Sequence, residues 1–339
     1  MKMRRLVVAM LVAVLACAAA GAEKKPKPDL QKPIAGPRAV VLRVTVLYVA
    51  PDKQSQKVDR VQPGREMVVA EKSGPWMRVY ANTDAEQMQD QRDMPLMGSE
   101  DENQSPVSGW MEAKGVVVET TENGDRVLMG EAANQESLAQ DPRGPVNAAQ
   151  TARLLYRRLK EMYPNSPLAP EAAWRTADIQ WQIEKADQAT RSSAREKESY
   201  LREGMNEDEL KKVIKKYPQT RQADLAAYDL IDNKLCGDWQ GSAKCPEKES
   251  DLYEKYAADH SDSPRAAQAL YQALYRQAVL TDMYAADENE NRSKAAHMHA
   301  SALALKLKDK FPTSEYSWRA GALVYKLDEG IPVYGIDRD

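Results

Sequence analysis

The 339-residue sequence has few of the residues that build most catalytic centres. It contains only three histidines and three cysteines, so groups for acid–base, metal and thiol chemistry are scarce. No G-x-x-x-x-G-K-[ST], G-x-G-x-x-G or G-x-S-x-G motif occurs, so neither a phosphate-binding loop nor a hydrolase nucleophile is indicated. We therefore expect no enzyme activity, no metal site and no cofactor.

The histidines themselves argue against a shared metal ion. His260 lies at an apolar position of a helical pattern, where a packed side chain is expected. His297 and His299 are two residues apart in a predicted helix, so their side chains should point in different directions.

The sequence also lacks a strong excess of charge and a membrane-spanning run. A formal net charge of -3 gives no electrostatic footprint for nucleic acid. The apolar run from Leu6 to Ala16 is shorter than the about 20 residues that a transmembrane helix needs. Basic residues precede this run and small residues follow it. This pattern predicts a signal peptide over residues 1–22.

Two ways of processing that signal peptide remain open. Ala20 and Ala22 form an A-x-A site that would release a chain beginning at Glu23. Alternatively, "VLAC" resembles a bacterial lipobox, in which cleavage before Cys17 would leave that cysteine lipidated as the first residue. Either route exports the protein, to the periplasm or to the outer membrane as a lipoprotein.

Cys236 and Cys245 remain after either route. An even pair of cysteines in an oxidising compartment favours a disulfide, with two free thiols as the alternative. A zinc site is disfavoured because the pair supplies too few ligands.

The first half of the chain changes character twice. Residues 23–37 are rich in Pro and Lys and predict an extended linker. Residues 38–119 contain short β-branched and aromatic segments separated by turns, which predicts a strand-rich unit. Within it, residues 82–106 are polar and predict a mobile insertion. Residues 120–146 are interpreted as a second linker.

The strands and turns of this unit contain a distinctive series of residues: Pro51, Val58, Val61, Pro63, Gly64, Val68, Val69, Trp76, Val79, Gly109 and Trp110. In this series the strand-rich unit resembles a bacterial Src-homology-3-like (SH3-like) domain. The resemblance implies a small all-β barrel, and relatives of such barrels can bind peptidoglycan. Tyr48, Trp76 and Trp110 are the best contact candidates, although Trp76 and Trp110 are also large enough to fill a small core.

Residues 147–328 have helical periodicity with a recurring stop and restart, and residues 329–339 form a C-terminal tail. Four anchor residues set the recurrence, and three of them precede a proline, which cannot continue a helix. A hydroxyl residue suited to begin a new helix lies three positions after each anchor, and small residues lie six and nine positions after it. This pattern predicts stacked helical hairpins that approach closely. The anchors are Tyr163, Tyr217, His260 and Phe311.

This block resembles tetratricopeptide (TPR)-type repeats, and its "YPNSPLAPEAAW" wording is similar to repeats of exported bacterial envelope lipoproteins. The anchors are more widely spaced than the standard repeat, and the W-x-x-L-G-x-x-Y signature is absent. The expected fold is therefore α+β and multidomain, with a small SH3-like barrel followed by an all-α TPR-like repeat domain. Trp174, Tyr228 and Tyr271 are expected to pack in the core, or else to line a concave face that binds extended segments.

The resemblances imply a non-enzymatic envelope scaffold or adaptor that binds proteins or peptides. The alternatives are a peptidoglycan-binding module, or an accessory subunit or degenerate form of an envelope enzyme. Envelope proteins or peptides are the expected partners, with peptidoglycan as a second class. Nucleic acid is not expected, and membrane contact is expected only through the N-terminal lipid anchor.

Overall fold

A computed structural model describes residues 35–84 and 106–333 of the chain. Nearly all of these residues belong to one unit, Gly36–Asp339. The predicted signal peptide, Cys17 and most of the 23–37 linker and the 82–106 insertion lie outside the described residues.

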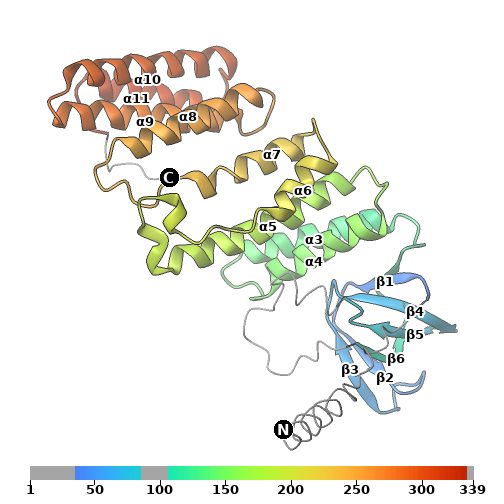
Figure 1. Ribbon diagram of the computed structural model, residues 1–339. Coiled ribbons are helices and arrows are strands. Elements are labelled where there is room, and N and C mark those ends of the chain that lie inside the picture. Colours follow the sequence, from blue (N-terminus) through green and yellow to red (C-terminus); the bar gives the residue numbers. More distant parts are fainter. Residues whose placement is uncertain (1–34, 85–105, 334–339) are drawn as a thin grey trace, which may run out of the picture. The chain divides into compact units, whose positions relative to one another are not determined.

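The N-terminal part is a seven-stranded antiparallel sheet with the strand order β3-β2-β6-β5-β4-β1-β7. Its strands are β1 (Arg38–Val41), β2 (Thr45–Tyr48), β3 (Lys57–Val61), β4 (Glu66–Ser73), β5 (Trp76–Ala81), β6 (Val107–Glu112) and β7 (Val116–Val118) (Figure 1). Among the described strands, no ladder joins β3 to β7. The sheet is therefore open, rather than the closed barrel expected from the sequence.

Residues along β5 alternate between a packed and a more exposed side. Met77, Val79 and Ala81 are buried, whereas the residues between them are more exposed. Gly109 in β6 is needed for close packing, because a Cβ atom there would lie 2.9 Å from Leu47 Cβ. Strand β1 is covered on both faces instead, because Val40 packs with residues of the helical part, whereas its neighbours pack within the sheet.

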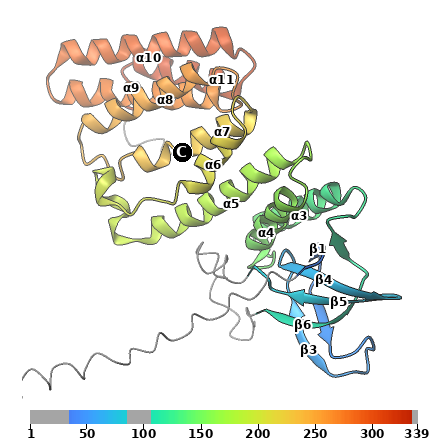
Figure 2. The same cartoon turned by 45° about the vertical axis from the view of Figure 1, so that its right-hand side comes forward.

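The C-terminal part of the described chain contains nine α-helices. They are α3 (Gly124–Gln140), α4 (Ala148–Met162), α5 (Ala169–Thr190), α6 (Asp208–Lys216), α7 (Arg221–Asp229), α8 (Lys244–Asp259), α9 (Ala266–Ala286), α10 (Glu290–Lys310) and α11 (Glu315–Asp328). Short 3-10 helices occur at η1 (Ser192–Arg195), η2 (Ser199–Leu201) and η3 (Asp232–Lys234). Helices α10 and α11 both pack against α9 (Figures 1 and 2).

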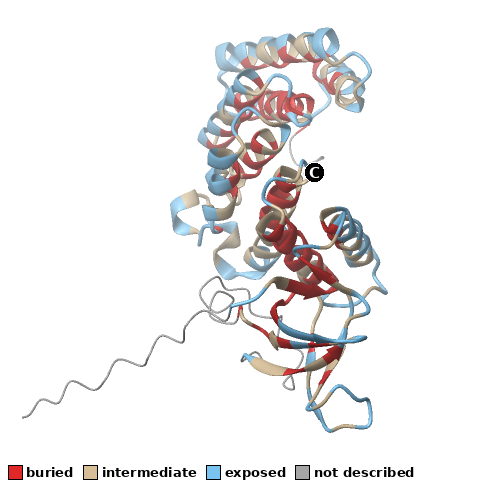
Figure 3. Ribbon diagram, turned by 90° about the vertical axis from the view of Figure 1, so that its right-hand side faces the viewer, coloured by how far each residue is buried: buried red, intermediate tan, exposed pale blue. Residues whose placement is uncertain are grey.

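The predicted stop and restart is confirmed at all four anchors. Each anchor is the C-cap residue of its helix, α4, α6, α8 or α10. Two of the four predicted capping residues, Thr220 and Ser314, cap the following helices, their side chains accepting hydrogen bonds from backbone amides. The N-cap residues of α5 and α9 are instead Leu168 and Arg265, which make no side-chain cap. The predicted alanines are fully buried where the helices meet, and Figure 3 shows buried residues in red along the packed sides of the helices. These alanines are Ala172, Ala226, Ala269 and Ala320.

Three predicted boundaries need correction. Residues 120–146 are not a linker, because α3 lies within them and packs against α4 through Leu128 and Ala132. The first residues of the predicted insertion are not solvated, because Asn82 is 2% and Asp84 is 0% exposed. The predicted tail is also anchored, since Val333 is buried and its amide donates to Asp282 Oδ2 at 2.6 Å. Within the described residues, no helix is long and apolar enough to cross a membrane.

Candidate functional site

The three aromatic residues predicted in the strand-rich unit lie together on one face of the sheet. Tyr48 is opposite Trp110 in the β2–β6 ladder, and Trp110 is opposite Arg78 in the β5–β6 ladder. Trp76 lies two residues before Arg78 and thus on the same face. The Tyr48 and Trp76 rings meet edge to face, with centroids 5.8 Å apart.

These residues form what we call the aromatic face, defined as Tyr48, Trp76, Arg78, Tyr80 and Trp110. Its four rings are half-buried and Arg78 is exposed. The intervening residues of β5 fill the core instead. Sequence reasoning missed Arg78 and Tyr80, although the period of two along β5 would have placed both beside Trp76.

The chemistry of the aromatic face suits binding rather than catalysis. Aromatic rings offer large, rigid apolar surfaces, and a ligand that covers them gains binding free energy by removing that surface from water. Arg78 adds a cation with several hydrogen-bond donors beside those rings. At one end, Lys53 and Glu112 form an exposed ion pair at 2.9 Å. The face therefore combines apolar contact with polar groups that would orient a ligand.

The three predicted aromatics of the helical part are distributed over two hydrophobic cores. Trp174 is buried among α5, α6 and α7, and its Nε1 donates to Asp229 Oδ2 at 3.3 Å. Tyr271 is buried in a second core, where its ring lies 5.7 Å from that of Tyr316. Tyr228 is half-buried beside that second core, with Arg265 5.5 Å above its ring. The structure thus does not bring these three side chains into one site.

The three histidines each pair with a carboxylate on another helix. The distances are 2.8 Å from His260 to Asp224, 2.9 Å from His297 to Asp328 and 2.9 Å from His299 to Glu254. His297 and His299 contact different helices, as their spacing predicts. In the described part of the chain, no group of three or more His, Cys, Asp or Glu side chains is arranged to hold a metal ion.

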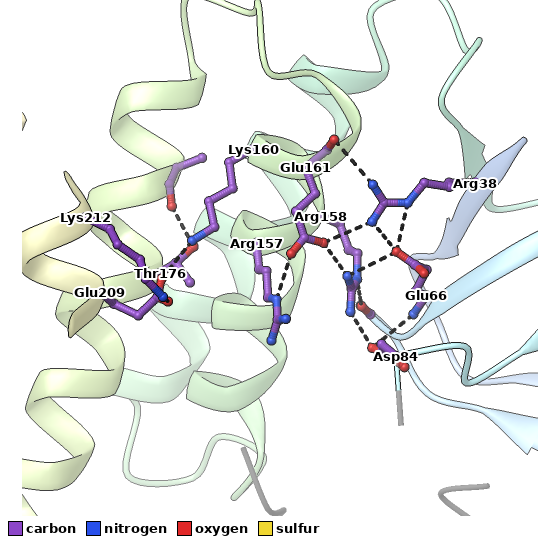
Figure 4. A network of polar contacts seen from close by, with 12 residues as sticks. Arg38, Glu66, Asp84, Arg157, Arg158, Lys160, Glu161, Thr176, Glu209 and Lys212 are labelled. Atoms are coloured by element: carbon purple, nitrogen blue, oxygen red, sulfur yellow. Dashed lines mark hydrogen bonds and ion pairs between the residues drawn. The ribbon is translucent and has the colours of Figure 1, made fainter. Parts of the chain in front are cut away.

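A buried charge network joins the sheet to helix α4 (Figure 4). The fully buried Arg158 donates from Nε to the Gly64 carbonyl at 2.9 Å and pairs with Asp84 and Glu161. Burial alone would raise the pKa of Glu161, but Arg158 and Arg157 overcome this effect and lower it. Gly64 permits the approach, because a Cβ there would lie 2.5 Å from Leu154 Cβ.

A second buried carboxylate lies between helices α5 and α7. Burial raises the pKa of Asp229 to about 7, and the nearby Asp178 carboxylate adds to the shift. Trp174 partly offsets it by donating to the Asp229 carboxylate. No local sequence signal predicts the raised pKa of Asp229, because the helix that carries its partner Trp174 lies 55 positions earlier in the chain.

Comparison with known proteins does not extend this description. The chain matches no protein-family model and no curated protein. Its candidate function must therefore be argued from the aromatic face and the helical domain themselves.

Proposed function

We propose that this protein is an exported, non-enzymatic adaptor of the bacterial envelope that binds polypeptide segments. In this proposal the sheet is an SH3-like domain and the helices are TPR-like repeats. The carrying observation is the aromatic face, where Tyr48, Trp76 and Trp110 come from three strands and lie beside the exposed Arg78. Export by the predicted signal peptide, with or without lipidation of Cys17, would place this face in the envelope.

Half-buried aromatic rings are favourable binding surfaces. Tyr and Trp bring large contact areas at a low cost in conformational entropy, because each has only two side-chain torsions. Extended peptides, especially proline-rich ones, dock into grooves lined by such rings. Arg78 supplies donors for the backbone carbonyls or carboxylates of such a segment.

Site-specific photo-crosslinking in a bacterial host tests this proposal. A photoreactive amino acid would replace Arg78 on the aromatic face, and the matched control would replace Lys72, which is exposed and opposite the core residue Met77 in the β4–β5 ladder. We expect discrete protein adducts from position 78 that weaken when Trp110→Ala is added. The proposal is wrong if both positions give the same adducts, or if position 78 gives none.

Peptidoglycan binding is the second candidate function. The observation that favours it is the flat, part-exposed area of Trp76 and Trp110 on adjacent strands, which would also cover the apolar side of sugar rings. Co-sedimentation with purified sacculi tests it, with the double variant Trp76→Ala/Trp110→Ala as comparison. Loss of sedimentation in that variant would support wall binding. The wall-binding proposal is wrong if both proteins sediment equally, or if neither protein sediments.

A further inference from the structure

A pocket of about 530 Å³ lies among helices α4, α5 and α6. We call it the lysine pocket. Figure 4 shows Lys160, Glu209 and Lys212 of this pocket pointing toward one another from α4 and α6. The lining residues are Lys160, Glu161, Ala173, Glu209, Lys212, Val213, Lys215, Lys216 and Tyr217.

The lining carries an excess of positive charge. It has four lysines and two glutamates, a difference of two charges. Both glutamates are already paired. Glu161 accepts from Arg157 at 2.9 Å and also pairs with Arg158, and Glu209 accepts from Lys160 at 3.1 Å and from Lys212 at 2.9 Å.

The two remaining lysines are solvent-exposed. Within the residues that the structure describes, neither Lys215 nor Lys216 forms an ion pair, and Lys216 lies 5.2 Å above the Tyr217 ring. Lys160 is more enclosed, with 19% of its side chain exposed, and it is already paired with Glu209. Burial lowers the pKa of Lys160, and Glu209 opposes that effect. A carboxylate entering the pocket would therefore meet unpaired cations at its exposed edge.

The floor of the pocket is apolar. Ala173 and Val213 are buried in the core between α5 and α6. Tyr217 packs against the same core, and its hydroxyl oxygen is closed off from solvent. A ligand in the pocket would therefore meet apolar surface at its floor.

We infer that the lysine pocket binds an acidic segment of a partner polypeptide, with carboxylates near Lys215 and Lys216. Apolar side chains of the same segment would cover Ala173 and Val213. The volume favours a peptide over a small inorganic anion, because it is within the range of pockets that bind drug-sized ligands. This inference rests on the proposed adaptor function, since it names the class of segment that the helical domain would bind.

Fluorescence anisotropy with the chain from Glu23 onward tests the inference. The probe is a short labelled peptide in which glutamates alternate with leucines, and its counterpart carries glutamines instead. We expect Lys215→Gln/Lys216→Gln to weaken binding of the glutamate peptide about tenfold and to reduce its salt dependence. The matched control is Lys244→Gln/Lys248→Gln, which removes the same charge from exposed positions of α8 and should leave binding unchanged.

Tyr217→Phe is a second control, because the buried hydroxyl that it removes is closed off from the pocket. This variant should bind the peptide as the wild type does, with an equal or higher unfolding midpoint. The inference is overturned if the two double-lysine variants bind alike, or if the glutamine peptide binds as well as the glutamate peptide.

Two further comparisons define the ligand and separate the proposals. Displacement of the peptide by inorganic phosphate, but not by chloride of equal ionic strength, would show a small-anion site and overturn the peptide inference. Crosslinking from position 78 with no peptide binding would overturn the lysine pocket and leave the adaptor function standing. Peptide binding lost only in the lysine variant, with no crosslinks from position 78, would support the pocket and overturn the aromatic face.

Discussion

The buried Glu249 carboxylate accepts a hydrogen bond from Arg276 Nε at 2.8 Å, which joins helix α8 to helix α9. The same carboxylate accepts from the Cys236 amide at 2.9 Å and from Trp239 Nε1 at 3.1 Å. Arg276 in turn lies 4.6 Å above the Tyr253 ring. One glutamate therefore holds two helices and the loop that carries the Cys236–Cys245 pair.

Removal of this carboxylate should be costly. Glu249→Ala leaves the Arg276 guanidinium buried without its partner, and we expect the free energy of unfolding to fall by about 3–5 kcal/mol. The control is Asp251→Ala, an exposed position of the same helix, which should change it by less than about 0.5 kcal/mol. Urea unfolding followed by circular dichroism measures both. Equal effects of the two substitutions would contradict the role given to Glu249.

The Cys236–Cys245 disulfide gives a second prediction. The two residues are joined by a disulfide in the structure, with Cα atoms 6.0 Å apart. The intact mass of protein purified without reductant should therefore be lower by two hydrogens than that of the dithiol form. Cys236→Ser/Cys245→Ser should lower the free energy of unfolding by about 2–3 kcal/mol, as expected for closure of a short loop. Free thiols at both positions in that protein would contradict this prediction.

The repeat boundaries could be predicted because their signals are local. A residue such as Tyr163 followed by Pro164 ends a helix whatever lies around it. Ala269 and its equivalents predicted close packing because a small side chain has the same consequence wherever two helices meet. The face that Trp76 occupies was left open by the sequence, and the structure places it on the side of β5 opposite the buried Met77.

The remaining features depend on residues that are distant in the sequence. Helix α3 was missed because Leu128 and Ala132 are its main buried side chains, too few to give a clear helical period. Asp84 was assigned to a mobile insertion because its partner Arg158 lies 74 positions away. The lysine pocket combines α4, α5 and α6, and none of these helices carries a binding motif by itself.

The Arg158 network should hold the sheet against α4. Arg158→Met removes one of the two arginines that pair with the fully buried Asp84 carboxylate and leaves Arg65 at 2.9 Å, so we expect a loss of about 1.5–3 kcal/mol in unfolding free energy. Hydrogen exchange by mass spectrometry should also show faster exchange in β4, which follows the Gly64 turn. The control Arg126→Met changes an exposed residue of α3 and should leave both quantities unchanged. Unaltered exchange in the Arg158 variant would contradict this role.

The raised pKa of Asp229 predicts a pH-dependent stability. The usual value for an aspartate is 3.8, and burial raises that of Asp229 to about 7 in the folded chain. Between these two values the folded protein retains a proton that the unfolded chain has lost. The contribution of Asp229 to stability therefore falls as the pH rises from about 4 to about 7, and the full penalty is present above that range.

Asp229→Asn removes this titration and keeps an oxygen that accepts from Trp174 Nε1. We expect the variant to be more stable than the wild type at pH 8, by at most about 4 kcal/mol for a shift of roughly three pKa units. The advantage should vanish below about pH 3, where the wild-type carboxyl is neutral in both states. Thermal unfolding across this range measures the difference, with the exposed Asp262→Asn as control. Asp178, Asp232 and Arg265 also affect the pKa of the Asp229 carboxyl, and they are unchanged in both variants. If the difference in stability between Asp229→Asn and the wild type is constant from pH 5 to pH 8, Asp229 is charged in the folded protein.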